Sequence, residues 1–361
     1  MQNFQELKLP APLEKALKKM QFTIPTPIQA QAIPIALTER DVIGCAQTGT
    51  GKTAAFCIPL IARLLELPNK IGLILIPTRE LATQIADVLK KLTSASPELK
   101  QALLIGGASM DRQMNMLRNR PRIIIATPGR LMDHLARKTV SLDNIAVVVL
   151  DEADRMLDMG FAPQLNKIFQ AVPRERQTLL FSATLPGDIE KMAAKWLNKP
   201  ARVTVGKVAQ TAAKISHSVV QTTVANKNNT LLDELNNRQG SILIFARTRY
   251  RTDRLAKYLS GFGHPVTHIH GDRTQGQRNS AIKGFRSGEF RILVATDIAA
   301  RGLDISHIAH VINYDLPQVA EDYIHRIGRT GRAGAEGQAL CLLTPEDRQQ
   351  WRSIARVLEA K

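Results

Sequence analysis

The chain has 361 residues, of which 44% are hydrophobic, so it has enough material for two or three folded domains and is not a disordered protein. Lysine and arginine total 49 against 32 acidic residues, and the net charge of +17 favours a polyanionic partner, with nucleic acid as the first candidate. A basic surface that only confers solubility, or that binds a membrane surface, is the alternative. No uncharged apolar run approaches the roughly 18 residues of a membrane span.

The cysteines and histidines give no metal-binding pattern in the sequence. Cys45, Cys57 and Cys341 are widely spaced, which predicts a reduced, cytoplasmic protein. The first ten residues lack a basic region followed by an apolar stretch, so we expect no secretory signal. His264, His268 and His270 are close together, but the sequence places no further ligand beside them, and we interpret them as structural.

Short apolar runs alternate with helix-like segments along the whole chain. The first series covers residues 41–46, 71–76, 122–126, 146–150 and 177–181. The second series covers residues 241–246, 265–269, 291–295, 309–313 and 338–343. Continuous Val/Ile/Leu runs are typical of parallel strands buried on both faces, so the pattern predicts an α/β fold with two domains. The polar, weakly patterned segment 206–214 is the predicted linker.

Residues suited to phosphate chemistry follow several of these runs directly. Such residues begin at positions 46, 77, 127, 151, 182 and 296. Ligands of open α/β sheets bind beyond the carboxyl ends of the strands, so this recurrence predicts one functional edge in each sheet. Core packing explains the apolar runs but not the polar residues at their ends.

Residues 46–53 match the spacing of a P-loop, with Ala46 in place of the usual first glycine. Two glycines allow turns that point backbone N–H groups at phosphate oxygens, Lys52 is suited to the β/γ oxygens, and Thr53 is suited to Mg²⁺. The predicted ATP-binding residues of this loop are Ala46, Gln47, Thr48, Gly49, Thr50, Gly51, Lys52 and Thr53. A glycine-rich structural turn is the alternative.

Two further segments support a nucleotide site. Asp151 and Glu152 follow an apolar run, which favours a magnesium carboxylate beside a residue that orients water; the alternative is an exposed helix start. Upstream, Thr26 is suited to cap a helix that begins at Pro27. The Gln29 amide is suited to the bidentate contact with adenine, and Phe22 to stacking on the ring.

With these segments in view, the chain resembles the DEAD-box ATP-dependent RNA helicases over essentially its whole length. The matching segments are Phe22, 25–29, 46–53, 77–81, 106–107, 127–130, 151–154, 182–184, 243–249, 270–278, 295–304 and 325–332. Ala46 is the family's own form of the P-loop, whereas Gln21 replaces a glycine that usually precedes Phe22. The compact ending is similar to the bacterial RhlE-like subgroup.

The resemblance implies two RecA-like domains, 1–205 and 215–361, with ATP in the cleft between them. The implied catalytic residues are Lys52, Asp151, Glu152 and two arginine fingers, Arg329 and Arg332. Asp297 is the implied ribose contact. The implied residues that couple hydrolysis to domain closure are Asp154, Ser182, Thr184, His325 and Arg326. The implied RNA contacts are Thr78, Arg79, Gly106, Gly107, Thr127, Arg130, Thr248 and Thr296.

From the residues alone, simpler readings of two of these sets stay open. The three arginines of 325–332 also suit a solvated basic turn, and Ser182 and Thr184 also suit simple hydroxyl caps at a strand end.

The implied function is RNA-stimulated ATP hydrolysis coupled to local, non-processive unwinding of short RNA duplexes or to remodelling of RNA–protein complexes. ATP and Mg²⁺ are the expected cofactors, and RNA-processing or ribosome-assembly proteins the expected partners of a monomer. Aromatic residues are only 4%, which argues against base stacking. The implied contacts with the phosphate backbone predict little sequence preference. An ATP-gated RNA clamp is the alternative. A DNA helicase is disfavoured, because we find neither a cysteine-rich zinc module nor a winged-helix-like region.

Overall fold

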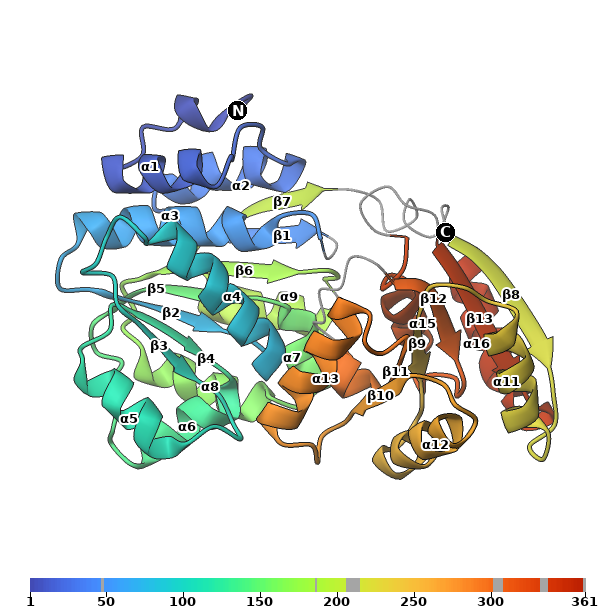
Figure 1. Ribbon diagram of the computed structural model, residues 1–361. Helices are drawn as coiled ribbons and strands as arrows, with labels where there is room; N and C mark the ends of the chain where they lie inside the picture. The colour runs from blue at the N-terminus through green and yellow to red at the C-terminus, as the bar shows by residue number, and fades with distance from the viewer. Residues whose placement is uncertain (47–48, 186, 206–214, 301–307, 332–336, 360–361) are drawn as a thin grey trace. The chain divides into compact units, whose positions relative to one another are not determined.

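The computed structural model describes residues 1–46, 49–185, 187–205, 215–300, 308–331 and 337–359. The chain divides into two compact units, Met1–Gly206 and Lys207–Lys361, which we describe separately (Figure 1). The predicted linker, 206–214, lies outside the described residues.

The first unit is built on a seven-stranded, wholly parallel sheet with the strand order β3-β4-β2-β5-β6-β1-β7 (Figure 1). Its strands are β1 (Val42–Ala46), β2 (Ile71–Leu75), β3 (Gln101–Leu104), β4 (Ile123–Ala126), β5 (Ile145–Leu150), β6 (Gln177–Ser182) and β7 (Ala201–Val205). The five apolar runs of the first series correspond to β1, β2, β4, β5 and β6. The sequence missed the two edge strands, β3 and β7, whose side chains alternate between buried and more exposed positions.

Helices cover both faces of this sheet. They are η1 (Phe4–Glu6), α1 (Ala11–Lys19), α2 (Pro27–Leu37), α3 (Lys52–Glu66), α4 (Arg79–Leu92), α5 (Met110–Arg118), α6 (Pro128–Ala136), α7 (Ala153–Asp158), α8 (Ala162–Ala171) and α9 (Gly187–Trp196). One apolar cluster joins α1 to α4 with one face of the sheet, and a second joins α6 to α9 with the other. Burial on both faces explains why the central strands are continuous apolar runs.

The second unit repeats this plan with a six-stranded parallel sheet in the order β10-β11-β9-β12-β13-β8. Its strands are β8 (Ile215–Gln221), β9 (Ser241–Phe245), β10 (Val266–Ile269), β11 (Ile292–Ala295), β12 (Ile308–Asn313) and β13 (Gly337–Leu343). Its helices are α11 (Lys227–Asn236), α12 (Arg249–Gly261), α13 (Gln275–Ser287), α14 (Asp297–Ala300), α15 (Ala320–Ile327), η2 (Pro345–Asp347) and α16 (Arg348–Glu359). The edge strand β8, which is mostly exposed, was also missed in the sequence.

Neighbouring residues of the second sheet point to opposite faces. Leu340 and Leu342 pack with α11 and α12, whereas Cys341 and Leu343 pack with α15 and α16. Helices α13 and α14 pack against a further apolar cluster of this sheet. In the described part of the chain, no helix combines the length and apolar character that crossing a membrane requires.

The end of α1 explains why the family that the chain resembles usually has a glycine at the position of Gln21. The Gln21 N–H donates to Lys18 O and the Phe22 N–H to Leu17 O, both at 3.0 Å, which is the pattern of a Schellman motif. This motif places Gln21 in the left-handed region, with φ of 56°, where a residue with a Cβ is strained. Gln21 therefore keeps the turn that glycine would form at lower conformational cost.

Candidate active site

Apart from Phe22 and Gln29, which precede β1, the predicted site residues of the first unit lie at or beyond the carboxyl ends of its strands. The strand order sorts them into two neighbouring groups. The strands β5, β6 and β1 are adjacent in the sheet and lead to Asp151, Ser182 and the P-loop. The strands β3, β4 and β2 are adjacent on the other side and lead to the predicted RNA contacts (Figure 1). We call the first group the nucleotide half of the sheet's carboxyl end and the second group, whose RNA contacts stay predictions, the RNA half.

The P-loop has the backbone geometry that its glycines predicted. Gly49 and Gly51 have φ values of 81° and 92°, and α3 begins immediately afterwards at Lys52. Lys52 is buried, and its Nζ donates to Ala46 O at 2.5 Å. The ammonium group thus lies across the loop, at the amino end of a helix, where anions bind favourably. Gln47 and Thr48 lie outside the described residues.

The segment before the P-loop is hydrogen-bonded to it. The Gln29 side chain accepts from the Thr26 N–H at 2.9 Å and donates through Nε2 to Gly51 O at 3.1 Å. Phe22 is half-buried and meets Phe4 edge to face, with ring centroids 5.6 Å apart. The adenine contacts of Gln29 and Phe22 stay predictions, and the structure adds a direct link from Gln29 to the phosphate loop.

Asp151 and Glu152 are both buried at the end of β5. Burial raises the pKa of the Asp151 carboxyl to about 7, although the charge of Lys52 opposes this shift. A carboxylate and the hydroxyl of Thr53 are hard oxygen donors that suit Mg²⁺, and a bound cation would offset the desolvation that disfavours the Asp151 charge. The residues present therefore fit a magnesium ion.

Glu152 is held in an unusual local conformation. Its φ is 51°, in the left-handed region, and its N–H donates to the Asp151 carboxylate at 3.0 Å. The Glu152 carboxylate forms an ion pair with Arg155 Nη1 at 2.5 Å, and both side chains are buried. The backbone and the ion pair together fix the orientation of this carboxylate.

Three predicted coupling residues form one hydrogen-bonded group. Both the Thr184 N–H and its hydroxyl donate to Asp154 Oδ2, at 3.0 and 2.9 Å. The Asp154 N–H donates to Ser182 Oγ at 3.2 Å. The register of β6 with β1 places Ser182 opposite Cys45, directly before the P-loop. The end of β6 is thus joined to the acidic segment after β5.

Arg79 and the two glycines of the RNA half come together from different parts of the chain. A Cβ on Gly106 would lie 3.1 Å from Arg79 Nη2, and a Cβ on Gly107 would overlap with Arg79 Nη1. Gly107 also has φ of 74°. The left-handed backbone at Gly107 therefore favours glycine, and a Cβ at Gly107 would displace the Arg79 guanidinium. Thr78 is buried and caps α4 by accepting from the Leu81 N–H at 3.4 Å.

Arg130 has a structural role that the sequence did not reveal. Its guanidinium donates to Ile105 O and to Gln113 Oε1, both at 3.2 Å, and to Ala108 O. The buried Gln113 also contacts His134 Nε2, at 3.1 Å. Arg130 thus holds the loop after β3 through hydrogen bonds to its carbonyl groups. The RNA contacts of Arg130 and of the buried Thr127 stay predictions. Gln113 and His134 were missed because isolated polar residues on helices carry no motif.

In the second unit, the predicted site residues again follow strand ends. Thr248 is exposed after β9 and caps α12, accepting from the Arg251 N–H at 3.2 Å, and Thr296 is buried after β11. Asp297 forms a bidentate pair with Arg326, in which both N···O distances are 2.6 Å. Because this pair occupies both carboxylate oxygens, the structure gives Asp297 a partner within the unit. Its predicted ribose contact stays a prediction.

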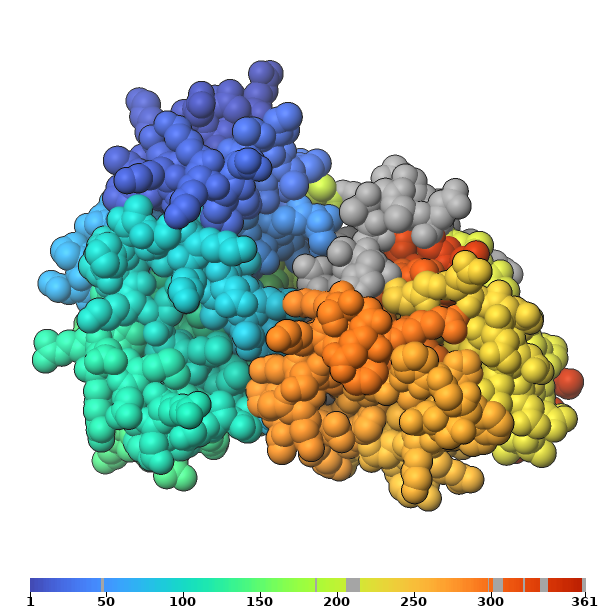
Figure 2. Space-filling model, in the orientation of Figure 1, coloured from blue at the N-terminus to red at the C-terminus, as the bar shows by residue number. Residues whose placement is uncertain are grey.

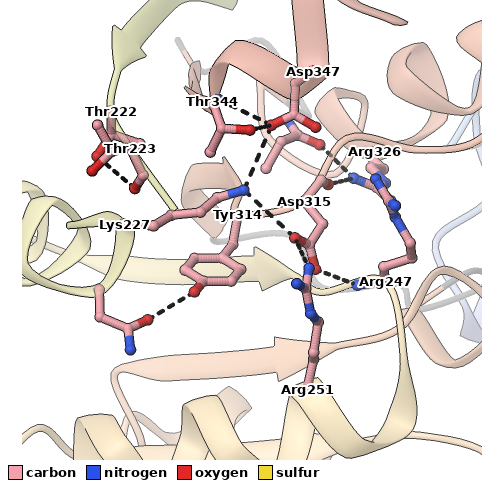
Figure 3. Close-up of polar contacts among 12 residues, drawn as sticks. Thr222, Thr223, Lys227, Arg247, Arg251, Tyr314, Asp315, Arg326, Thr344 and Asp347 are labelled. Atoms are coloured by element: carbon pink, nitrogen blue, oxygen red, sulfur yellow. Dashed lines mark hydrogen bonds and ion pairs between the residues drawn. The ribbon is translucent and has the colours of Figure 1, made fainter. Parts of the chain in front are cut away.

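The buried Asp315 joins several of these segments (Figure 3). Its carboxylate accepts from the Arg247 N–H at 2.9 Å and pairs with Arg251 at 2.6 Å and with Lys227 at 3.5 Å. Its backbone oxygen accepts from Arg326 Nη1 at 2.6 Å. Asp315, which follows β12, thus positions both the start of α12 and Arg326 of α15.

The remaining arginines lie at the end of α15 and beyond it. Arg326 and Arg329 are both buried, and Arg329 Nε donates to His325 O at 3.2 Å. Half-exposed His325 lies 3.6 Å from Asp322. Arg332 lies outside the described residues, and the roles of His325, Arg329 and Arg332 stay predictions.

A P-loop between a parallel strand and a helix, with acidic and hydroxyl residues at the neighbouring strand ends, defines a nucleotide-hydrolysing α/β protein. Residues 26–192 match the family model of the DEAD/DEAH box helicase, and residues 226–334 match the helicase conserved C-terminal domain. The chain belongs to the DEAD-box family of ATP-dependent RNA helicases.

Individual relatives agree with this assignment. The chain is 44% identical to the DEAD-box ATP-dependent RNA helicase CshA of Bacillus subtilis, over 99% of this chain and 73% of that protein. It is 45% identical to the ATP-dependent rRNA helicase RRP3 of Debaryomyces hansenii, over 99% of this chain and 76% of that protein. The solved structure of S. cerevisiae Dbp5 bound to RNA and ADP BeF3 matches with a TM-score of 0.87 and 31% identity, over 100% of this chain and 93% of that one.

These relatives confirm the predicted family and the fold of two RecA-like, parallel-sheet domains. The relatives named here carry the names CshA and RRP3, and the RhlE-like subgroup stays a prediction.

Proposed function

We propose that this ATP-dependent RNA helicase couples RNA-stimulated ATP hydrolysis to local, non-processive separation of short RNA duplexes or to remodelling of RNA–protein complexes. The observation that supports the proposal is the strand order, which groups the predicted nucleotide residues at the carboxyl ends of β5, β6 and β1 and the predicted RNA contacts at the carboxyl ends of β3, β4 and β2. The two halves meet where β2 pairs with β5. An RNA strand bound at the RNA half therefore lies beside the residues that bind the nucleotide phosphates.

In the nucleotide half, the P-loop N–H groups and Lys52 bind the phosphates, and Thr53 and Asp151 hold magnesium. Bound Mg²⁺ supplies charge neutralisation on the phosphate oxygens. Glu152 orients the attacking water through the carboxylate that Arg155 fixes. Arg329 and Arg332, from the second unit, stabilise the charge of the transition state when the two units close on the nucleotide, a contribution worth about 10³–10⁵ in rate.

In the RNA half, Thr78, Arg79, Gly107 and Thr127 bind the phosphate backbone of one strand, and Thr248 and Thr296 of the second unit bind the same strand. Backbone contacts of this kind fix the position of a strand without reading its bases. The hydrogen bonds that Thr184 donates to the Asp154 carboxylate, and the one that the Asp154 N–H donates to Ser182 Oγ, connect closure to hydrolysis. With a net charge of +17, RNA affinity should fall steeply with salt.

The natural substrate and setting are further parts of the proposal. One relative is named an rRNA helicase, which supports ribosomal RNA as the substrate class and ribosome-assembly or RNA-processing proteins as partners. All three cysteines are free, which supports the cytoplasm as the location. We propose a monomer as the working state, because both sets of site residues come from one chain.

The proposal is tested by measuring ATP turnover of the full chain with no nucleic acid, with single-stranded RNA and with single-stranded DNA of the same sequence. We expect strong stimulation by RNA and little by DNA. Turnover that is equal in all three conditions would contradict coupling between the two halves of the site.

The clamp alternative is distinguished by kinetics. We expect RNA to dissociate at a rate similar to that of ATP hydrolysis, measured with a fluorescent RNA under chase. RNA that stays bound through many turnovers would show that the chain acts as a clamp rather than as an unwinding enzyme.

A further inference from the structure

A group of three potential metal ligands lies in the second unit, next to Thr296, a predicted RNA contact whose N–H donates to Ile269 O at 3.4 Å. His268 and His270 are two apart along β10 and the residue after it, so they point to the same face of the sheet. Their rings are nearly parallel, 11° apart, with centroids separated by 5.7 Å. Asp253 approaches them from α12: its Oδ1 lies 2.9 Å from His268 Nε2 and 2.8 Å from His270 Nε2.

We propose that Asp253, His268 and His270 form a zinc-binding site. The three donor atoms lie within 4.8 Å of one another. Two imidazoles and one carboxylate, with a fourth position left for water, form a recurrent ligand set for zinc. The histidine spacing alone lacked a third ligand, and the packing of α12 on β10 supplies it.

The secondary-structure elements that carry the three ligands suit a metal site. The two histidines stand on a strand and its end and the aspartate stands on a helix, so the backbone fixes all three positions. His270 is buried and His268 is partly buried, whereas the Asp253 side chain is 51% exposed. Because the Asp253 side chain is exposed, an ion can reach the group from solvent on that side. Figure 2 shows residues of α12 and α13 at the surface of the unit.

The ligands must move slightly to admit the ion. Zinc–ligand distances of about 2.0–2.1 Å in a tetrahedral site place neighbouring donor atoms about 3.3 Å apart. The Asp253 oxygen is now closer than that to both nitrogens, because it accepts their hydrogen bonds. A rotation of the exposed Asp253 side chain opens this space and leaves the strand undisturbed.

Two neighbours oppose the cation and limit its affinity. The Asp272 N–H donates to His270 Nδ1 at 3.3 Å, so the imidazole proton is on Nε2 in the metal-free protein and must move to Nδ1 when the metal binds. Arg273 carries a positive charge near His268. For these reasons we expect micromolar rather than nanomolar affinity.

The donor set also predicts which ion is preferred. Imidazole nitrogen suits zinc, cobalt and nickel, whereas magnesium and calcium prefer oxygen ligands. The site should therefore not bind the Mg²⁺ that accompanies ATP. A bound ion would link α12 to β10 and raise the stability of the second unit by mass action.

The test uses the full chain, freed of metal with a chelator and titrated with Zn²⁺ by isothermal titration calorimetry without nucleotide. We expect one equivalent of zinc to bind with micromolar affinity, and His268→Gln to weaken this binding at least tenfold. His264→Gln is the matched control, because His264 lies on the same segment but outside the cluster, and it should bind as the wild type does. Asp253→Asn is a second variant, and circular dichroism verifies that each variant is folded.

Two further measurements make the outcome specific. Co²⁺ should give the visible absorption of a four- or five-coordinate site in the wild type and lose it in His268→Gln. Zinc should raise the melting temperature of the wild type but not that of His268→Gln. Absence of zinc binding by the wild type, or binding that survives both His268→Gln and Asp253→Asn, would overturn the proposal.

Discussion

Replacing Asp151 with asparagine should make the first unit more stable while abolishing ATP hydrolysis. Burial raises the Asp151 pKa from 3.8 to about 7. At 1.36 kcal/mol per pKa unit, ionising this carboxyl costs about 4 kcal/mol more in the folded protein than in the unfolded chain. The asparagine keeps the shape and can still accept the Glu152 N–H, but it carries no charge. Above pH 7 we therefore expect a stability gain of a few kcal/mol.

The sign of the pH dependence follows from the raised pKa. Between about pH 4 and pH 7 the folded wild type keeps the Asp151 proton that the unfolded chain has lost, so wild-type stability falls as the pH rises through this range. The Asp151→Asn variant has no such group. Its advantage should be small near pH 4, grow up to pH 7 and remain constant above it.

The assay is urea unfolding without nucleotide at several pH values. Trp196 lies in the first unit and Trp351 in the second, so a Trp351→Phe background makes fluorescence report on the first unit alone. Asp154→Asn is not a neutral comparison, since it removes hydrogen bonds to Thr184. Exposed Asp188→Asn is the control and should show no gain. A difference between wild type and Asp151→Asn that stays constant from pH 4.5 to pH 8 would refute the reasoning.

Four other substitutions test separate parts of the site. Glu152→Gln should bind ATP and hydrolyse it at least a hundredfold more slowly, measured by single turnover; unchanged hydrolysis would remove its role in orienting water. Arg329→Ala should keep ATP affinity within a few fold and lower RNA-stimulated kcat about 10³-fold or more; an unaltered kcat would contradict the arginine-finger role. Gly107→Ala should weaken RNA binding in fluorescence anisotropy severalfold, because its Cβ meets Arg79, whereas Gly160→Ala, with a similar φ of 76° and open space around it, should not. Gln21→Gly should stabilise the first unit by up to about 1 kcal/mol, or about 2–4 °C in Tm, because it removes a left-handed strain, and Gln21→Ala should give no such gain.

The sequence predicted every central strand of the two sheets and the edge strand β10, but it missed the other three edge strands, for a physical reason. A strand buried on both faces must be apolar throughout, and all five runs of the first series have that character. The edge strands β3, β7 and β8 have partly exposed side chains, so their residues alternate or are mostly polar. These strands are short and contain few apolar side chains, so their alternation is too weak to separate them from loops in the sequence.

The motifs likewise supplied candidate site residues, whose roles stay predictions, but did not reveal the residues that contact them. Each motif is a local pattern, whereas the contacts of Gln29 with Gly51, of Arg130 with Ile105 and of Asp297 with Arg326 join separate segments. The order of the strands across the sheet is also a tertiary property. The separation of the nucleotide half from the RNA half therefore became visible only in the folded chain.

The position of Asp315 has a consequence for how the two ligands influence each other. Its carboxylate steadies the turn that bears Thr248, and its main-chain oxygen steadies the helix that leads to Arg329. Under the proposed RNA contact of Thr248, a shift of this turn would be transmitted through Asp315 to the Arg326 guanidinium without any change in the apolar interior. Substitutions of Asp315 should therefore leave the RNA-independent rate of ATP hydrolysis unchanged while reducing its stimulation by RNA.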